Sequence, residues 1–269
     1  MFSDCPLVKK YFGKYLRQLL QAHDTEGFIG RFVKYANYPY GLEARLQRVE
    51  YVGITQSVLD EVGNYTKPSE LDDRLLDAWA ELRLVDQLVQ EGFSAIRKVN
   101  ETADFAAFLN GQMYAFQVTR VKKPLLKRVK KHSDNLSPYG SWTDINKRFR
   151  KPTRLVFLRA INEKNIKFAA WKQGNCIRCI VLVSIDEALQ DNLVRHFVCQ
   201  GISQRMGELK VRNFEAVLWL PDLGNGALFQ FQADGTVKCA ADWQDDPGDP
   251  RYRQVKVSRW EVNLLSDTD

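Results

Sequence analysis

The chain has 269 residues, of which 45% are hydrophobic and 12% aromatic, so its composition suffices for a sizeable core and argues against disorder. No stretch approaches about 18 uninterrupted apolar residues, and the first residues lack a basic start followed by an apolar run, so the sequence predicts a cytoplasmic protein without a membrane span or signal peptide. The net charge of +6 favours an anionic partner.

Residues 1–68 are predicted to form a helical region. Apolar and aromatic residues from Leu7 to Leu19 repeat at helical spacing, with basic residues between them. A further helix is predicted from Leu42 to Val62, separated from the preceding segment by Tyr38-Pro-Tyr-Gly41. We expect this region to pack on the rest of the protein, or to bind a second copy or a protein partner.

A hairpin is predicted around Asn110-Gly111, because this dipeptide separates two runs rich in apolar residues and both central residues of a type I′ turn need positive φ. A two-residue loop fixes the register and pairs Asp104 with Gln117 across the two strands. Thr119 lies on the same face of the sheet. A carboxylate, an amide and a hydroxyl therefore gather at one end of an otherwise apolar face.

Upstream of this hairpin, a helix is predicted from a capping-type signal at Ser69 to Gly92. Its apolar face includes Leu84 and Val85, and Glu81 borders that face. A carboxylate in such a position is expected to have a partner.

The remaining elements complete an α/β pattern. A strand from Ser94 to Val99 precedes the hairpin, a helix is predicted from Arg159 to Lys172, and Ile177 to Ile185 has the continuous apolar run of a strand buried on both faces. Residues 201–269 are predicted to form a β-rich extension, with a second hairpin turn at Asp234-Gly235. Residues 69–200 would form the α/β core.

This order of helix, three strands, helix and strand resembles the restriction-endonuclease-like, or PD-(D/E)XK, nuclease superfamily over roughly residues 70 to 185. The resemblance implies a mixed-sheet core of α-β-β-β-α-β order that hydrolyses phosphodiesters with Mg²⁺ or Mn²⁺. It implies that Glu81, Asp104 and Gln117 are the metal ligands, with Gln117 at the position where some members have glutamine in place of glutamate. Thr119 stands where the family has its catalytic lysine.

The missing lysine would need a replacement. Lys123 has the same parity as Thr119 if the strand continues, and Lys122 and Lys127 are alternatives. The catalytic set implied by the resemblance is therefore Glu81, Asp104, Gln117, Thr119 and Lys123.

A dense run of basic residues follows the hairpin, and nucleic-acid phosphate is the natural counter-charge for it. A solvated surface is the alternative. The candidate nucleic-acid-binding residues are Lys122, Lys123, Lys127, Arg128, Lys130 and Lys131.

A zinc site is conceivable at Cys176, Cys179, His196 and Cys199, which have ligand-like spacing. Zinc is not favoured, because Cys179 begins the apolar run of a buried strand and small buried cysteines are common in cores. With five widely spaced cysteines in the chain, free thiols are expected rather than disulfides.

Three functions follow from these observations. The first is a metal-dependent nuclease acting on DNA in preference to RNA. The second is a nucleic-acid-binding module that keeps the nuclease fold without its chemistry. The third is a protein-assembly subunit that binds its partners through the helical N-terminal region.

Overall fold

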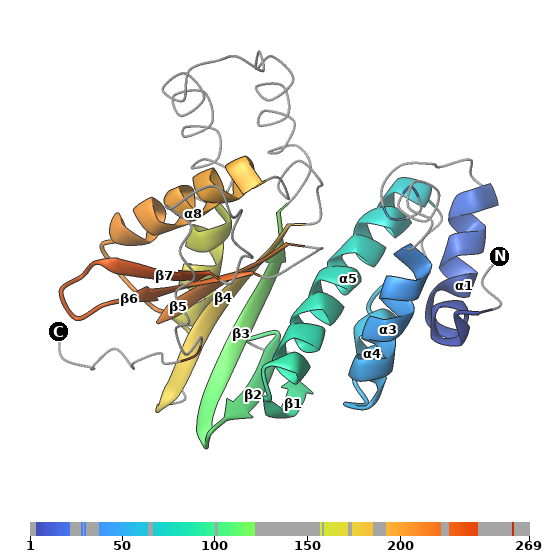
Figure 1. Ribbon diagram of the computed structural model, residues 1–269, viewed down its shortest axis with the longest axis horizontal. Coiled ribbons are helices and arrows are strands. Elements are labelled where there is room, and N and C mark those ends of the chain that lie inside the picture. The colour runs from blue at the N-terminus through green and yellow to red at the C-terminus, as the bar shows by residue number, and fades with distance from the viewer. Residues whose placement is uncertain are drawn as a thin grey trace, which may run out of the picture. The chain divides into compact units, whose positions relative to one another are not determined.

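The computed structural model shows a mixed α/β protein, as the sequence predicts (Figure 1). The chain divides into two compact units: Met1–Lys98 with Ala107–Leu109, and Val99–Ala106 with Asn110–Asp269. The limits predicted at residues 68 and 200 are not limits of these units, and the three-region division stays a prediction. The structure describes residues 4–21, 28, 30, 38–63, 67–99, 102–121, 157, 159–171, 174–184, 192–221, 226–241 and 260.

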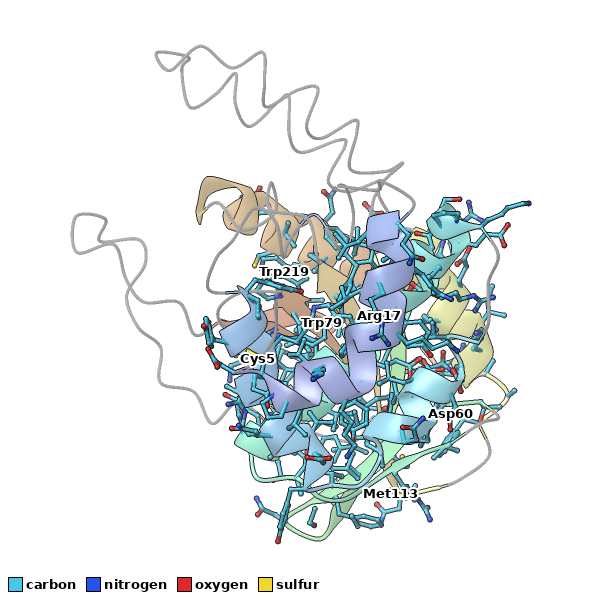
Figure 2. The ribbon with its side chains drawn as sticks, turned by 90° about the vertical axis from the view of Figure 1, so that its right-hand side faces the viewer. Cys5, Arg17, Asp60, Trp79, Met113 and Trp219 are labelled. Carbon is cyan, nitrogen blue, oxygen red and sulfur yellow. The ribbon has the colours of Figure 1, made fainter. Side chains whose placement is uncertain are left out.

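The first unit is built on helices. They are α1 (Pro6–Gln21), α3 (Tyr38–Glu50), α4 (Thr55–Asp60) and α5 (Pro68–Gln90). Trp79 of α5 is fully buried within this unit, whereas Arg17 of α1 is exposed (Figure 2). Glu43 of α3 is buried, and its carboxylate accepts hydrogen bonds from the backbone N–H groups of Leu7 and Val8 at 3.1 and 2.9 Å. A side chain of one helix thus satisfies amides at the start of another, which have no partner within their own helix.

The single helix predicted from Leu42 to Val62 is wrong in two respects. It begins earlier, because Pro39 tolerates an early helical position where no N–H donor is needed. It is also interrupted, because Gly53 takes a left-handed φ of 80° between α3 and α4.

Within the described residues, seven strands form one mixed sheet whose order follows the sequence, β1-β2-β3-β4-β5-β6-β7. β3 pairs with β4 in parallel and β4 with β5 in parallel, whereas β5, β6 and β7 pair in antiparallel fashion. The strands are β1 (Ser94–Lys98), β2 (Phe105–Leu109), β3 (Gln112–Arg120), β4 (Cys176–Ser184), β5 (Ala216–Pro221), β6 (Ala227–Phe231) and β7 (Val237–Ala241).

Both predicted hairpin turns are present. Asn110 and Gly111, between β2 and β3, have φ values of 50° and 79°, as a type I′ turn requires. Gly235 has a φ of 79° in the turn between β6 and β7, where the Thr236 N–H and hydroxyl both donate to Asp234 Oδ1. The predicted β extension is therefore part of the same sheet.

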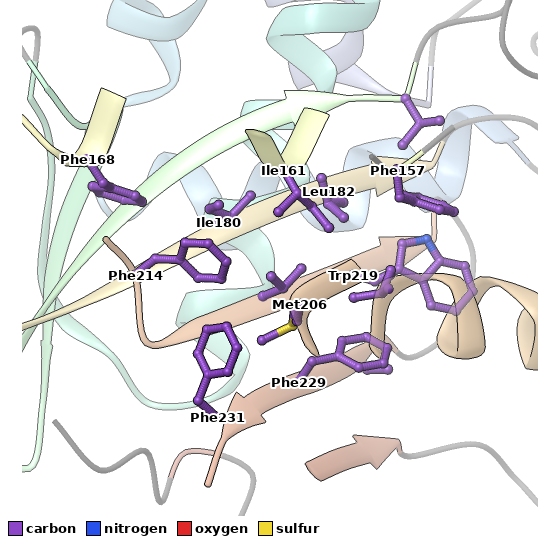
Figure 3. Packing of buried hydrophobic residues seen from close by; sticks show 14 of the residues in the cluster. Phe157, Ile161, Phe168, Ile180, Leu182, Met206, Phe214, Trp219, Phe229 and Phe231 are labelled. Atoms are coloured by element: carbon purple, nitrogen blue, oxygen red, sulfur yellow. The ribbon is translucent and has the colours of Figure 1, made fainter. Parts of the chain in front are cut away.

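One face of the second unit's strands carries an apolar cluster (Figure 3). The helix at residues 159–168 contributes Ile161 and Phe168, and α8 (Asn192–Gly207) contributes Met206. These side chains pack on alternate residues of the strands, including Ile180 of β4 and Trp219 of β5. The two helices thus cover one face of this part of the sheet.

None of the helices in the described ranges is both long and apolar enough to cross a membrane.

Gly226 gives a test of this packing. A Cβ atom there would lie 2.1 Å from the backbone oxygen of Trp219, a distance that demands movement of the main chain. We expect Gly226→Ala to lower the free energy of unfolding by roughly 1–3 kcal/mol, the usual cost of overpacking. Gly207→Ala is the matched control, because a Cβ there meets nothing within 4 Å, and it should be neutral or slightly stabilising. Equal denaturation midpoints for both variants would contradict the assigned packing at Gly226.

Candidate active site at the ends of β2 and β3

Asp104 lies immediately before β2, alongside β3, close to its predicted place. Its backbone N–H donates to the Phe116 carbonyl at 2.8 Å, and its carboxylate atom Oδ2 accepts a hydrogen bond of 2.6 Å from the Val118 N–H. A carboxylate held by a backbone donor has a fixed direction, because the donor belongs to a paired strand. The Asp104 side chain is 30% exposed, so it remains open to a ligand.

Gln117 lies on β3 and is almost fully buried. Its amide nitrogen donates to the Thr102 carbonyl, which fixes the side-chain oxygen in the opposite direction. Gln117 is paired with Ile180 across the parallel β3–β4 register, and Thr119 with Leu182. Because side chains alternate along a strand, Gln117 and Thr119 share the face on which Ile180 and Leu182 join the apolar cluster. Gln117 and Thr119 therefore lie on one face of β3, and the joint site with Asp104 stays a prediction.

Lys164 joins this group from the helix at residues 159–168, and sequence reasoning missed it. Its ammonium nitrogen lies 2.9 Å from Gln117 Oε1 and 3.5 Å from Asp104 Oδ2. The Lys164 side chain is only 12% exposed, so most of it is shielded from solvent. Lys164 follows Ile161 by three residues and precedes Phe168 by four, so its spacing within the helix already indicated an inward direction.

Glu81 belongs to the first unit, where Lys98 is a partner of the expected kind. Glu81 Oε2 lies 3.1 Å from Lys98 Nζ, and Glu61 Oε1 lies 2.5 Å from the same nitrogen. Burial alone would lower the pKa of Lys98, but its hydrogen bonds and charge interactions with the two carboxylates raise that pKa above its ordinary value. The ammonium therefore stays charged between the two acids. The metal-binding role that the resemblance implies for Glu81 stays a prediction.

Lys123 is the candidate to replace the missing catalytic lysine, and it lies outside the described residues. The rest of the basic run does too. The run comprises Lys122, Lys123, Lys127, Arg128, Lys130 and Lys131. Their roles stay predictions.

No group of three or more His, Cys, Asp or Glu side chains in the described ranges is arranged to hold a metal ion. Asp104 nevertheless offers one carboxylate and Gln117 one amide oxygen. Magnesium is commonly held by only one or two carboxylates, with waters and substrate phosphates completing its shell. The oxygen donors at the end of β3 are therefore of the kind that such a cation uses.

The cysteines with zinc-like spacing occupy the core. Cys176 and Cys179 are buried on β4, and an offset of three residues places them on opposite faces of that strand. Burial raises the pKa of the Cys176 thiol to about 12 and also raises that of Cys179. Both are thus held as thiols in the metal-free protein. The side chain of His196 lies outside the described residues.

Comparison with known proteins adds no assignment. No family model, curated protein or solved structure matches this chain.

Thiol labelling tests the assignment of the cysteines. We expect a thiol reagent at pH 8 to modify Cys239 of β7, which is exposed, while Cys176 and Cys179 react only after unfolding. Peptide mapping by mass spectrometry identifies the modified positions, and Cys239→Ser should remove the rapid reaction at that site. Rapid labelling of Cys176 in the folded protein would contradict its burial.

Proposed function

We propose that the chain is a metal-dependent nuclease that hydrolyses phosphodiester bonds, with DNA favoured over RNA. The order α5, β1, β2, β3, helix 159–168 and β4 supports this proposal, because it is the order that the restriction-endonuclease resemblance implies. The main observation in favour of the proposal is the position of the Asp104 carboxylate, which the Val118 N–H holds beside β3.

Asp104 would be the principal metal ligand. Because Val118 engages Oδ2, the second carboxylate oxygen is left to bind a cation; it has no hydrogen bond within the part of the chain that the structure describes. Gln117 would contribute its amide oxygen, which the bond to Thr102 already directs away from the backbone. A bound Mg²⁺ or Mn²⁺ would polarise the scissile phosphate and lower the pKa of an attacking water.

The charge of the chain supports a nucleic-acid substrate. The run from Lys122 to Lys131 directly follows β3, and therefore follows in sequence the strand that carries Gln117. Lysine and arginine contacts to phosphate hold a nucleic acid without reading its sequence.

A catalytically inactive nucleic-acid-binding module is the second candidate, and a specific contact favours it. The ammonium of Lys164 lies within 3.5 Å of oxygens from both Asp104 and Gln117. An internal cation at this point can satisfy the two oxygens without a metal ion. Metal binding by the purified protein distinguishes the two candidates.

The first test of the proposal is Asp104→Asn. The amide oxygen can still accept the Val118 hydrogen bond, so the fold should be kept, whereas the loss of the negative charge should weaken cation binding. We expect Mg²⁺-dependent cleavage of plasmid DNA to fall on the order of a hundredfold or more, the scale on which removal of one stabilising group acts.

Glu163→Gln provides the control for this loss, because Glu163 is an exposed acid on the helix that carries Lys164. The control should cleave as the unaltered protein does. Equal cleavage by Asp104→Asn and Glu163→Gln would reject Asp104 as the metal ligand.

The second test concerns the substrate. The fourfold replacement of Lys127, Arg128, Lys130 and Lys131 by alanine should weaken DNA binding similarly across sequences. It should also reduce the slope of log K against log salt concentration by about 0.9 for each phosphate that the protein no longer neutralises. A fluorescence titration at several salt concentrations measures this slope.

A variant of α1 controls for the general loss of positive charge. Lys9, Lys14 and Arg17 are exposed on that helix, and their replacement by alanine should leave the salt slope almost unchanged. Equal slopes for the basic-run variant and the unaltered protein would show that the run does not bind phosphate and is a solvated surface.

A further inference from the structure

The ammonium of Lys164 contacts residues on and next to the sheet instead of extending into solvent. A lysine on a helix covering an apolar face normally extends its ammonium to water, and Lys167, one turn further on, is exposed. The ammonium of Lys164 instead contacts Gln117 Oε1 and Asp104 Oδ2, at 2.9 and 3.5 Å. The Lys164 side chain is only 12% exposed, so the ammonium has little freedom to move elsewhere.

We propose that Lys164 is the catalytic cation of this site, in place of the lysine that is absent at Thr119. The inference rests on the proposed function. Thr119 shares the face of Gln117 but carries only a hydroxyl, so it cannot offset negative charge. Lys164 brings a positive charge to Gln117 and Asp104 from the helix at residues 159–168. The cation thus comes from the helix and the oxygens come from the hairpin.

In the hydrolysis, an oxygen–phosphorus bond forms from water and the bond from phosphorus to the leaving oxygen breaks. The water proton passes to solvent, and a proton from solvent reaches the leaving oxygen. Lys164 stays protonated throughout, donates hydrogen bonds to the attacking water or to a phosphate oxygen, and reduces the negative charge that collects there. Its contact with Gln117 Oε1 keeps the ammonium in place before the substrate arrives.

A purely structural role for Lys164 makes a different prediction. If the lysine only stabilised the fold through its ion pair, its removal would lower stability and weaken every property of the site together. A catalytic cation beside a metal ligand instead opposes metal binding, because like charges repel, while it promotes cleavage. Removal of the charge should therefore move metal affinity and cleavage in opposite directions.

The test uses Lys164→Met in the full chain, because methionine keeps an unbranched stem and removes the charge. We expect Mg²⁺-dependent cleavage to fall on the order of a hundredfold. The affinity for Mn²⁺, measured by calorimetry without DNA, should rise by about tenfold, since the positive charge beside the Asp104 carboxylate no longer repels the ion. Lys167→Met is the control on the same helix and should change neither quantity.

A relocated lysine provides a rescue. Thr119→Lys in the Lys164→Met protein restores an ammonium to the face of Gln117 and should recover part of the lost cleavage. If Lys164→Met lowers the melting midpoint by more than a few degrees, Lys164→Gln gives the same comparison, because its amide can donate to both oxygens without charge. Cleavage and Mn²⁺ affinity that both stay at the unaltered level in the neutral variants would overturn the inference.

The outcomes separate this inference from the proposed function. If Asp104→Asn abolishes cleavage and Lys164→Met does not, the nuclease stands and Lys164 is not its catalytic cation. If the unaltered protein binds DNA but shows no Mg²⁺- or Mn²⁺-dependent cleavage, and Lys164→Met gains Mn²⁺ binding, the ammonium takes the place of the metal. That result would overturn both proposals and favour the inactive binding module.

Discussion

The burial of an apolar helix face against the sheet is the interaction on which the second unit depends. Ile161 and Phe168 are fully buried in one cluster with Ile180 of β4, and their positions fix the rotation of the helix about its own axis. Lys164 follows Ile161 by three residues and precedes Phe168 by four, so it lies on the helix face that these two residues share. Apolar burial supplies most of the free energy, at roughly 25 cal/mol per Å² of surface removed from water. The direction of the Lys164 side chain follows from that burial.

The polar contacts at the end of β3 can persist because each buried group has a partner. Gln117 donates to the Thr102 carbonyl and accepts from Lys164, while Asp104 accepts from the Val118 amide. An unpaired amide or charge in this position would cost several kcal/mol of desolvation. The buried groups are thus partnered, whereas the second carboxylate oxygen of Asp104, on a side chain that is 30% exposed, has no hydrogen bond in the described part of the chain.

The sequence predicted those features that depend on residues close together in the chain. Asn110-Gly111 determines its turn through local backbone conformation, and this turn brought Asp104 beside β3 without any knowledge of the remaining fold. Lys164 was missed because its partners lie 47 and 60 residues away, and the rotation of its helix depends on packing with α8 and the strands. The break at Gly53 was missed because a glycine can continue a helix as well as end it, and here it takes the left-handed φ that ends one.

The order of the sheet has a consequence for how the protein reaches its fold. Every strand is paired with the strand that precedes it in the sequence, from β1 through β7. No pairing has to wait for a distant part of the chain, so each closes a loop no longer than the segment between consecutive strands. Two of these segments are long, the one between β3 and β4 and the one between β4 and β5, and the others are much shorter. The sheet can therefore grow in one direction as the chain leaves the ribosome, with the larger costs of loop closure falling on the two parallel pairings.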